Sequence, residues 1–158
     1  MTFVPPDFAV PAVLESADFR LRMLTVHDLV KDYDAVMTSR DHLAGVFGPD
    51  SGWPDESLTL EQDLIDLGWH QKEFQTRRSF TYTVMAPDES QCLGCCYLLP
   101  SPRPDFDAMA IAWVRHSHRT LDGDLLAALK GWLGTRWPFK RVAFPGRDIS
   151  WAEWSSPV

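Results

Sequence analysis

The chain has 158 residues, of which 45% are hydrophobic and 23% are charged, so it is long enough for one domain with a buried core. Its formal net charge is −7, and no run of basic residues is longer than two. Nucleic-acid binding needs a concentrated basic face, so no nucleic-acid partner is expected. No basic segment precedes an apolar run at the N-terminus, and no apolar run reaches membrane-spanning length. We therefore expect a cytoplasmic protein with no membrane partner.

The first 18 residues contain three prolines and predict an extended arm, or a frayed tail, ahead of a single domain of residues 19–158. Alternating and apolar patterns in that domain predict strands at 19–24, 79–86, 92–99, 108–114 and 141–144. Helical spacing predicts helices at 25–40, 41–46, 59–78 and 124–133, followed by a helical turn at the C-terminal end. In helix 59–78, the expected buried face consists of Leu60, Leu64, Leu67 and Phe74.

Three cysteines, Cys92, Cys95 and Cys96, lie within one predicted strand. The spacing of the first two is found in redox and zinc sites, but such sites need a second ligand pair or a helix N-terminus. An odd, clustered set also makes no disulfide framework. We expect the three thiols to serve as small core residues.

The stretch from 106 to 133 is the most informative part of the sequence. Residues 108–114 are apolar at every position, which predicts a strand buried on both faces in the middle of a sheet. A polar turn at 115–124 leads from this strand into an amphipathic helix. The unpaired N–H groups at such a helix N-terminus are suited to binding phosphate.

This order of elements resembles the GNAT acetyltransferase superfamily over residues 19–146. The resemblance implies an α/β (α+β) fold with a mixed, mostly antiparallel central sheet flanked by helices. Here the fold ends soon after its fifth strand, because about a dozen residues follow Gly146. In that family the fourth strand and the following turn hold acetyl-CoA. The resemblance therefore implies acetyl-CoA as co-substrate, with 108–114 as the strand that contacts it.

The resemblance also implies cofactor-binding residues in the turn. Val114, Arg115 and His116 would contact the pantetheine arm, while Arg119, Thr120 and Gly123 would hold the pyrophosphate. The family pattern begins with Arg or Gln and places small residues where the phosphates approach the backbone.

This turn departs from the family pattern at three positions. Asp122 stands where the first glycine is usual, Gly123 comes one position late, and Asp124 stands at the last small position. Two carboxylates would repel a pyrophosphate unless they point away or nearby cations offset them. Arg115, Arg119, His116 and His118 are the candidate cations.

Acyl transfer to an amine needs a base for the amine proton and an acid for the departing thiolate. Tyr97 is the candidate catalytic acid, and Tyr82 on its hairpin partner could also face the split between the strands. A core role with a bonded hydroxyl is the alternative for Tyr97. His70, Glu61 and Glu73 are candidate bases with structural alternatives. His116 and His118 share a spacing that suits a metal, but no further ligand pattern accompanies them, so no metal site is expected.

Two functions follow from these features. The first is a GNAT-like N-acyltransferase that moves an acetyl group from acetyl-CoA to an amine of a small molecule. The second is a catalytically inactive domain of the same fold that has lost acetyl-CoA binding and acts in ligand binding or protein interaction. An edge strand at the end of the sheet also makes a homodimer a possible assembly.

Overall fold

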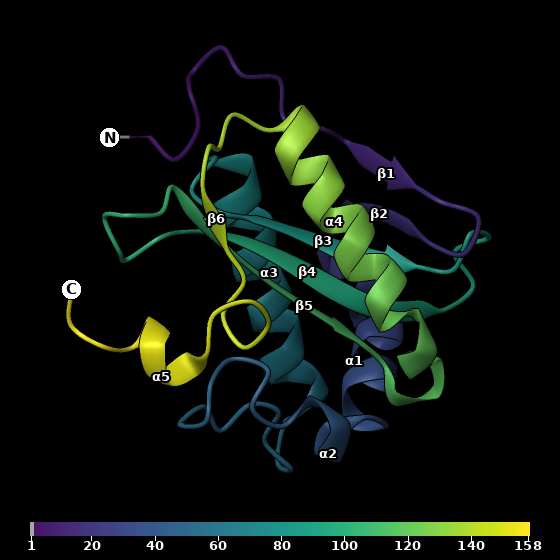
Figure 1. The fold of residues 1–158 in the computed structure, drawn as a ribbon. Helices are drawn as coiled ribbons and strands as arrows, with labels where there is room; N and C mark the ends of the chain where they lie inside the picture. The colour runs from purple at the N-terminus through teal and green to yellow at the C-terminus, as the bar shows by residue number, and fades with distance from the viewer. Residues whose placement is uncertain (1) are drawn as a thin grey trace.

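Six strands form one sheet in the computed structural model, which describes residues 2–158 (Figure 1). The strands are β1 (Val13–Glu15), β2 (Arg20–Met23), β3 (Phe80–Met85), β4 (Cys92–Pro100), β5 (Ala108–Val114) and β6 (Val142–Ala143). The helices are α1 (Leu29–Met37), α2 (Arg40–Leu43), α3 (Leu60–Gln75), α4 (Asp122–Arg136) and α5 (Trp151–Trp154), with short 3-10 helices η1 (Val26–Asp28) and η2 (His116–Leu121). Within the described residues, no helix is long and apolar enough to cross a membrane.

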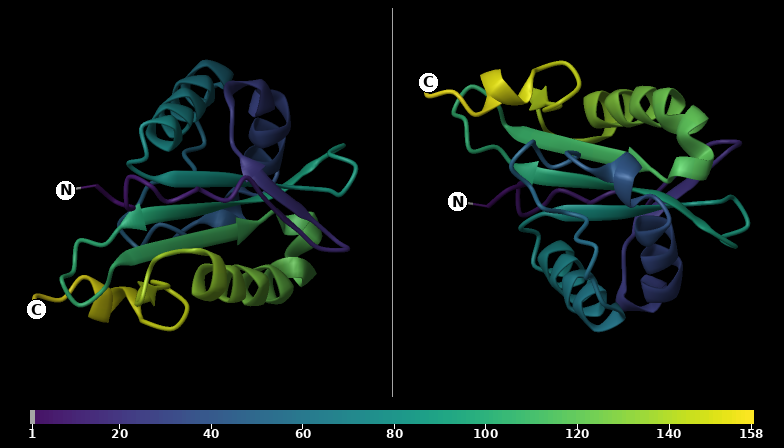
Figure 2. Two further views of the ribbon diagram at one scale, coloured as in Figure 1. Left: turned by 90° about the horizontal axis from the view of Figure 1, so that it is seen from above. Right: turned by 90° about the horizontal axis from the view of Figure 1, so that it is seen from below.

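The strands lie side by side in chain order, and neighbours are antiparallel except for β5 and β6, which are parallel. Helices α1 and α3 cover one face of the sheet and α4 covers the other (Figure 2). One apolar cluster lies between the sheet and α4, and a second lies beneath α1 and α3. This arrangement confirms the fold class expected from the sequence.

Strand β5 occupies the interior position predicted for the apolar run 108–114. It pairs with β4 along its whole length and with β6 at its first two residues. All its residues are buried except Met109, which is half-buried. The cysteines of β4 are likewise free and buried, as expected of small core residues.

The N-terminal arm contains a strand that the sequence analysis did not predict. Residues 13–15 form β1, which pairs with β2 at one edge of the sheet. The Tyr82 hydroxyl donates a hydrogen bond to the carbonyl of Pro11 at 2.6 Å. The Arg77 guanidinium donates to the carbonyls of Pro5 and Phe8 at 2.7 and 2.9 Å. These bonds hold the arm along the domain.

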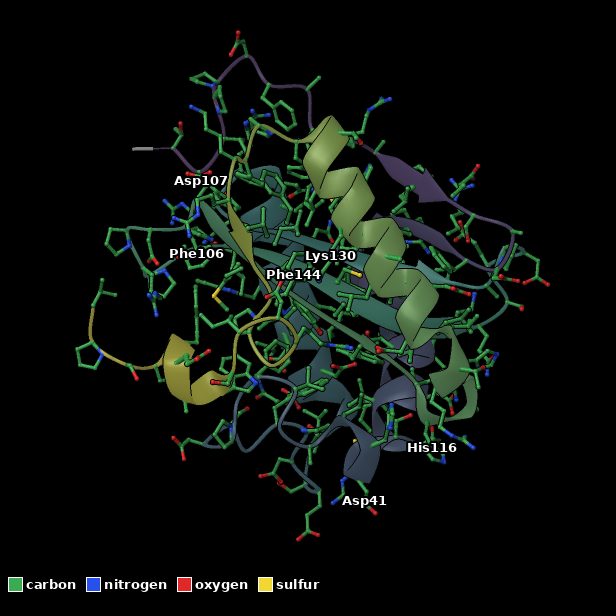
Figure 3. The ribbon with its side chains drawn as sticks, viewed as in Figure 1. Asp41, Phe106, Asp107, His116, Lys130 and Phe144 are labelled. Carbon is green, nitrogen blue, oxygen red and sulfur yellow. The ribbon has the colours of Figure 1, made fainter. Side chains whose placement is uncertain are left out.

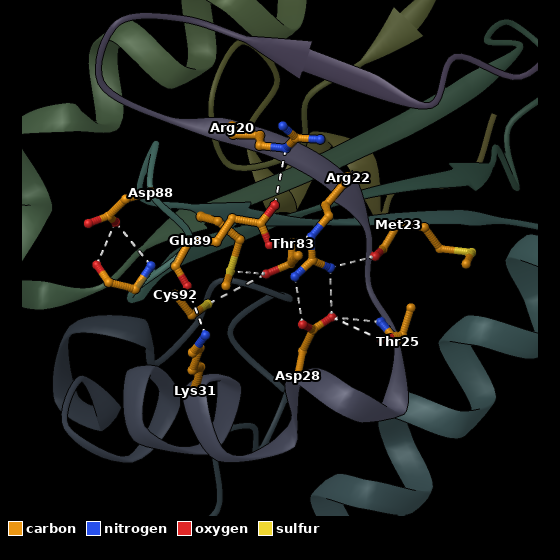
Figure 4. A network of polar contacts seen from close by, with 12 residues as sticks. Arg20, Arg22, Met23, Thr25, Asp28, Lys31, Thr83, Asp88, Glu89 and Cys92 are labelled. Atoms are coloured by element: carbon orange, nitrogen blue, oxygen red, sulfur yellow. Dashed lines mark hydrogen bonds and ion pairs between the residues drawn. The ribbon is translucent and has the colours of Figure 1, made fainter.

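An ion-pair network fixes the start of α1 against β2 (Figure 4). The Arg22 guanidinium donates to both carboxylate oxygens of Asp28 at 2.8 and 3.0 Å, and its Nε donates to Glu89 at 2.8 Å. Asp28 also accepts from the backbone N–H of Thr25 at 2.9 Å, which caps η1. The buried charge of Asp28 is therefore neutralised within the network.

The buried face of α3 differs from the prediction. Leu60 and Leu64 are 49% and 40% exposed, so their predicted burial was wrong, whereas Leu67 is buried. The inward positions of this helix are Asp63, Leu67 and Phe74, which are spaced by four and seven residues. The helix is therefore turned so that a carboxyl group, and not a leucine, faces the interior in its first turn.

Candidate functional site

Strands β5 and β6 part after only two paired positions. Ala108 pairs with Val142 and Met109 with Ala143, and β6 then ends. A cavity of about 270 Å³ opens beyond this point, lined by residues 110–112 of β5 and residues 144–147 of the following loop. We call it the strand-split cavity. A linear ligand with amide groups can hydrogen-bond to a strand edge of this kind in the manner of an added strand.

Arg147 crosses the strand-split cavity. Its guanidinium donates to the carbonyl of Ala112 in β5 at 3.0 Å and to both carboxylate oxygens of Asp122 at 2.5 and 2.8 Å. Asp122 lies in the first turn of α4, where a carboxylate also interacts favourably with the helix dipole. The negative charge that departs from the family pattern is thus neutralised by an arginine 25 residues further along the chain.

The C-terminal segment closes one wall of the strand-split cavity. Trp151 lines the cavity and packs against two glycines with positive φ, Gly48 at 110° and Gly146 at 81°. A Cβ atom on Gly146 would lie 2.6 Å from the indole Nε1 of Trp151, so the close packing requires glycine there. Phe144, another wall residue, is covered on its outer side by the ammonium of Lys130 at 4.9 Å (Figure 3).

Two of the predicted cofactor residues, Val114 and Arg115, are buried. Val114 belongs to the apolar cluster beneath α4. The Arg115 guanidinium donates to the carbonyl of Cys92 at 3.1 Å, to Asp34 at 3.0 Å and to the Thr38 hydroxyl at 3.2 Å. The arginine side chain therefore fastens α1 to β4, and cofactor contacts for these two residues stay a prediction.

His116 lies where η2 meets α2 (Figure 3). Its backbone N–H donates to the Ser39 hydroxyl at 2.9 Å, and its ring centroid is 5.4 Å from that of His42. A cavity of about 510 Å³ beside it is also lined by Arg40 and Asp41. The fold thus places His116 beside Arg40, Asp41 and His42 of α2.

Arg119, Thr120 and Gly123 are exposed at the start of α4 and in the η2 turn before it. The Arg119 guanidinium donates to the carbonyl of His116 at 3.1 Å. No atom of another part of the chain would lie within 4 Å of a Cβ on Gly123, so the backbone is open to a ligand there. Binding of pyrophosphate by these residues also stays a prediction.

Tyr97 lies on β4 opposite Ile111, which lines the strand-split cavity. Its hydroxyl accepts a hydrogen bond from the indole N–H of Trp113 at 3.0 Å, and its ring meets Phe47 at a centroid distance of 5.0 Å. Burial raises the pKa of the Tyr97 hydroxyl well above its usual value. The phenol therefore keeps its proton at neutral pH and remains able to donate it.

A second cavity, also of about 270 Å³, adjoins Tyr97 between the sheet, α1 and α3. We call it the helix-side cavity. It is lined by Asp32, Asp63, His70 and Trp53 in addition to Tyr97. Because Tyr97 pairs with Ile111 across β4 and β5, the helix-side and strand-split cavities lie on either side of these paired residues.

His70 is half-buried, and its Nδ1 lies 3.1 Å from the Thr81 hydroxyl. Burial lowers the pKa of its imidazole, while Asp66 and Glu73 partly oppose that effect. The ring is therefore neutral at neutral pH and can accept a proton. The structure thus brings two of the candidates from the sequence, His70 and Tyr97, together at one cavity with ring centroids 5.5 Å apart.

Three residues at these cavities were missed by the sequence analysis. Asp32 and Asp63 are only 5% and 4% exposed. Burial and neighbouring carboxylates raise the pKa of Asp32 well above its usual value, and burial also raises the pKa of Asp63. The helical spacing between Asp63 and Leu67 could have identified Asp63 as an inward-facing residue of α3. The position of Arg147 depends on the tertiary fold alone.

No protein-family model matches the sequence, and no curated protein matches it. Solved structures do match the fold. A ribosomal-protein α-N-acetyltransferase, RimL, in complex with coenzyme A superposes with a TM-score of 0.66 and 15% identity, covering 84% of this chain and 73% of that one. The chain has the fold of the GNAT-type N-acetyltransferases.

Two further GNAT-fold structures agree with this assignment. An acetyltransferase from Salmonella typhimurium that modifies the N-terminal serine of a 50S ribosomal protein has a TM-score of 0.61 and 14% identity, with 82% of this chain and 71% of that chain covered. A ribosomal-protein-alanine acetyltransferase from Vibrio fischeri has a TM-score of 0.59 and 18% identity, with 78% and 67% covered. At these sequence identities, the structural likeness shows that the chain has the GNAT fold and does not show its activity.

Proposed function

We propose that this chain is an N-acyltransferase that transfers an acetyl group from acetyl-CoA to an amine of a small molecule. The observation that supports the proposal is the strand-split cavity, because the GNAT fold has its acyl donor at this strand. Residues 110–112 present a strand edge to that cavity. The two amide groups of a pantetheine arm can pair with such an edge.

The rest of the donor would lie toward the start of α4. The helix N-terminus with Thr120 and Gly123 would face the pyrophosphate, and the Arg119 guanidinium would add positive charge there. His116 would lie beside it as a hydrogen-bonding side chain. Asp122 does not oppose this placement, since Arg147 neutralises it.

The chemistry would take place beside Tyr97. The neutral amine nitrogen attacks the thioester carbonyl carbon, the carbon–sulfur bond breaks, and an amide and a thiol are formed. His70 accepts the proton that the amine loses, and the Tyr97 hydroxyl donates a proton to the departing sulfur. The proton balance closes when Tyr97 is reprotonated from solvent and His70 releases its proton there.

Acetyl-CoA binding tests the donor site. In a thermal unfolding experiment, a ligand at 100 times its dissociation constant stabilises the folded state by about 2.7 kcal/mol, which raises the melting temperature by a few degrees in a chain of this size. We expect such a shift at millimolar acetyl-CoA. If the melting temperature does not move, the proposed donor site is wrong.

The ion pair of Asp122 and Arg147 makes this test more specific. Asp122→Asn should tighten acetyl-CoA binding by about 0.3–1 kcal/mol, because it releases the Arg147 guanidinium from its ion pair and leaves it free for the phosphates. Arg147→Ala should weaken binding by a similar amount, because Asp122 is then uncompensated. Asp7→Asn, at an exposed position of the N-terminal arm, changes the net charge equally and should leave acetyl-CoA binding unchanged.

The contact of Arg147 with the Ala112 carbonyl favours the alternative function, a ligand-binding or interaction domain without acetyl-CoA. In that case the arginine blocks the strand edge permanently. Tighter acetyl-CoA binding by Arg147→Ala than by the unmodified protein would support this alternative, because a blocking side chain would have been removed.

A further inference from the structure

Asp32 and Asp63 form a buried carboxyl pair in the helix-side cavity. They come from α1 and α3, are 5% and 4% exposed, and both line the cavity. Burial raises the pKa of both carboxyl groups, and their proximity raises that of Asp32 further, so the pair holds a proton when the cavity is empty. Among the described residues, neither forms a salt bridge. When both are ionised, Asp63 Oδ2 has no hydrogen-bond donor. Nothing in this part of the fold supplies the positive charge that two buried carboxylates require.

Asp28, another buried carboxylate nearby, has the cationic partner that Asp32 and Asp63 lack. Asp28 lies one helical turn before Asp32 and is paired with Arg22 (Figure 4). Within residues 2–158, no lysine or arginine is among the other titratable groups that face the carboxyl pair. These groups are Asp66 and His70 of α3 and Cys92, Cys95 and Tyr97 of β4. The pair is therefore left without a cation in the most acidic part of the cavity.

The other walls of the helix-side cavity suit an organic cation. Phe47, Trp53, Trp69 and Tyr97 line it, and aromatic rings attract an ammonium group and pack against an alkyl chain. Its volume of about 270 Å³ suits a small molecule. Among the described residues, no group of three or more His, Cys, Asp or Glu side chains could hold a metal ion, so a metal is not the expected occupant.

We propose that the carboxyl pair of Asp32 and Asp63 binds one ammonium group of a small diamine whose other nitrogen is the one that is acylated. This inference rests on the proposed function for its second half. A nitrogen held as an ammonium between two carboxylates keeps its proton and has no lone pair with which to attack a thioester. The reacting nitrogen must instead lie at the Tyr97 end of the cavity, next to the strand-split cavity, so the acceptor has two basic nitrogens.

Calorimetric titration of the protein without acetyl-CoA tests the carboxyl pair directly. We expect diaminobutane to bind about 10- to 100-fold more tightly than aminobutane, since the second ammonium gains charge-assisted hydrogen bonds to buried carboxylates. Binding should release about one proton, because the ammonium displaces the proton shared by the pair. The measured heat should therefore depend on the ionisation enthalpy of the buffer.

The matched variants are Asp63→Asn and Glu61→Gln, each of which replaces a carboxyl group in the first turn of α3 with an amide of the same length. Asp63→Asn should abolish the preference for diaminobutane over aminobutane and keep or raise the melting temperature, because an amide can donate to an ionised Asp32. Glu61 is exposed, and Glu61→Gln should bind diaminobutane as the unmodified protein does. A merely structural role for Asp63 predicts a lower melting temperature with the preference retained.

The outcomes separate the two proposals. Selective diaminobutane binding without any acetyl-CoA binding would support the ammonium site and contradict the acyltransferase. Acetylation of aminobutane as fast as of diaminobutane would support the acyltransferase and overturn the inference. Three further results would each overturn the ammonium site: equal affinities for the two amines, unchanged binding of diaminobutane by Asp63→Asn, or tighter binding of magnesium chloride than of diaminobutane.

Discussion

Gly94→Ala is expected to lower the free energy of unfolding by about 3 kcal/mol, a large loss for a domain of this size. Gly94 lies on β4 opposite Val114 of β5, next to the point where the register with β3 shifts by one residue. A Cβ atom there would lie 2.0 Å from the backbone carbonyl oxygen of Trp113. The clashing atom belongs to the backbone of β5 and cannot move aside by a rotamer change, as a flexible side chain could. The strands β4 and β5 would therefore have to separate.

Gly134→Ala is the matched control for this substitution. Gly134 is an exposed residue of α4, and a Cβ added there would meet no atom within 4 Å. Alanine should stabilise the helix by about 0.5–1 kcal/mol. Urea unfolding curves of the two variants measure both effects. If Gly94→Ala unfolds at the same urea concentration as the unmodified protein, the close approach of β4 and β5 is incorrect.

Tyr97→Phe is expected to lower kcat for acetyl transfer by about 100-fold or more, within the range of a lost general acid. The substitution keeps the buried ring and removes the hydroxyl. It also leaves the Trp113 indole N–H without its acceptor, so a loss of about 1 kcal/mol of stability is expected alongside the kinetic effect. Because the variant remains folded, the loss of activity can be assigned to the hydroxyl.

Tyr82→Phe distinguishes a catalytic loss from a structural one. Tyr82 belongs to the apolar cluster on the opposite face of the sheet, and its hydroxyl donates only to the Pro11 carbonyl at 2.6 Å. Its removal should also cost about 1 kcal/mol of stability but leave kcat unchanged. Equal kcat values for the two phenylalanine variants would contradict the role of Tyr97 as the acid. Kinetics under saturating acetyl-CoA, with circular dichroism melts of both variants, provide the comparison.

The central strand and its helix could be predicted because their patterns are local. The unbroken apolar run 108–114 indicates a strand buried on both faces, and β5 is that strand. The strand β1 was missed because residues 13–15 show no long alternation, and their structure depends on the neighbouring edge of β2. Local patterns do not record such a partner.

The candidate site could be predicted only in part for the same reason. His70 and Tyr97 were recognised by residue type, and their shared cavity results from packing α3 on β4. The cofactor contact expected of Arg115 stays a prediction, and its contacts with Thr38 and Asp34 could not be predicted because these residues are 77 and 81 positions away in the chain. The face of α3 was misjudged because hydrophobic spacing assumes that leucines lie inside. Asp63 breaks that rule, and residues that break it are often found at functional sites.

Product analysis by mass spectrometry tests the central claim most directly. The purified protein is incubated with acetyl-CoA and diaminobutane, and free thiol and acetylated amine are measured in the same samples. The acyltransferase proposal predicts equal amounts of thiol and of monoacetylated diamine, both formed much more slowly by Tyr97→Phe. Absence of acetylated amine in a sample whose protein binds both acetyl-CoA and diaminobutane would contradict it.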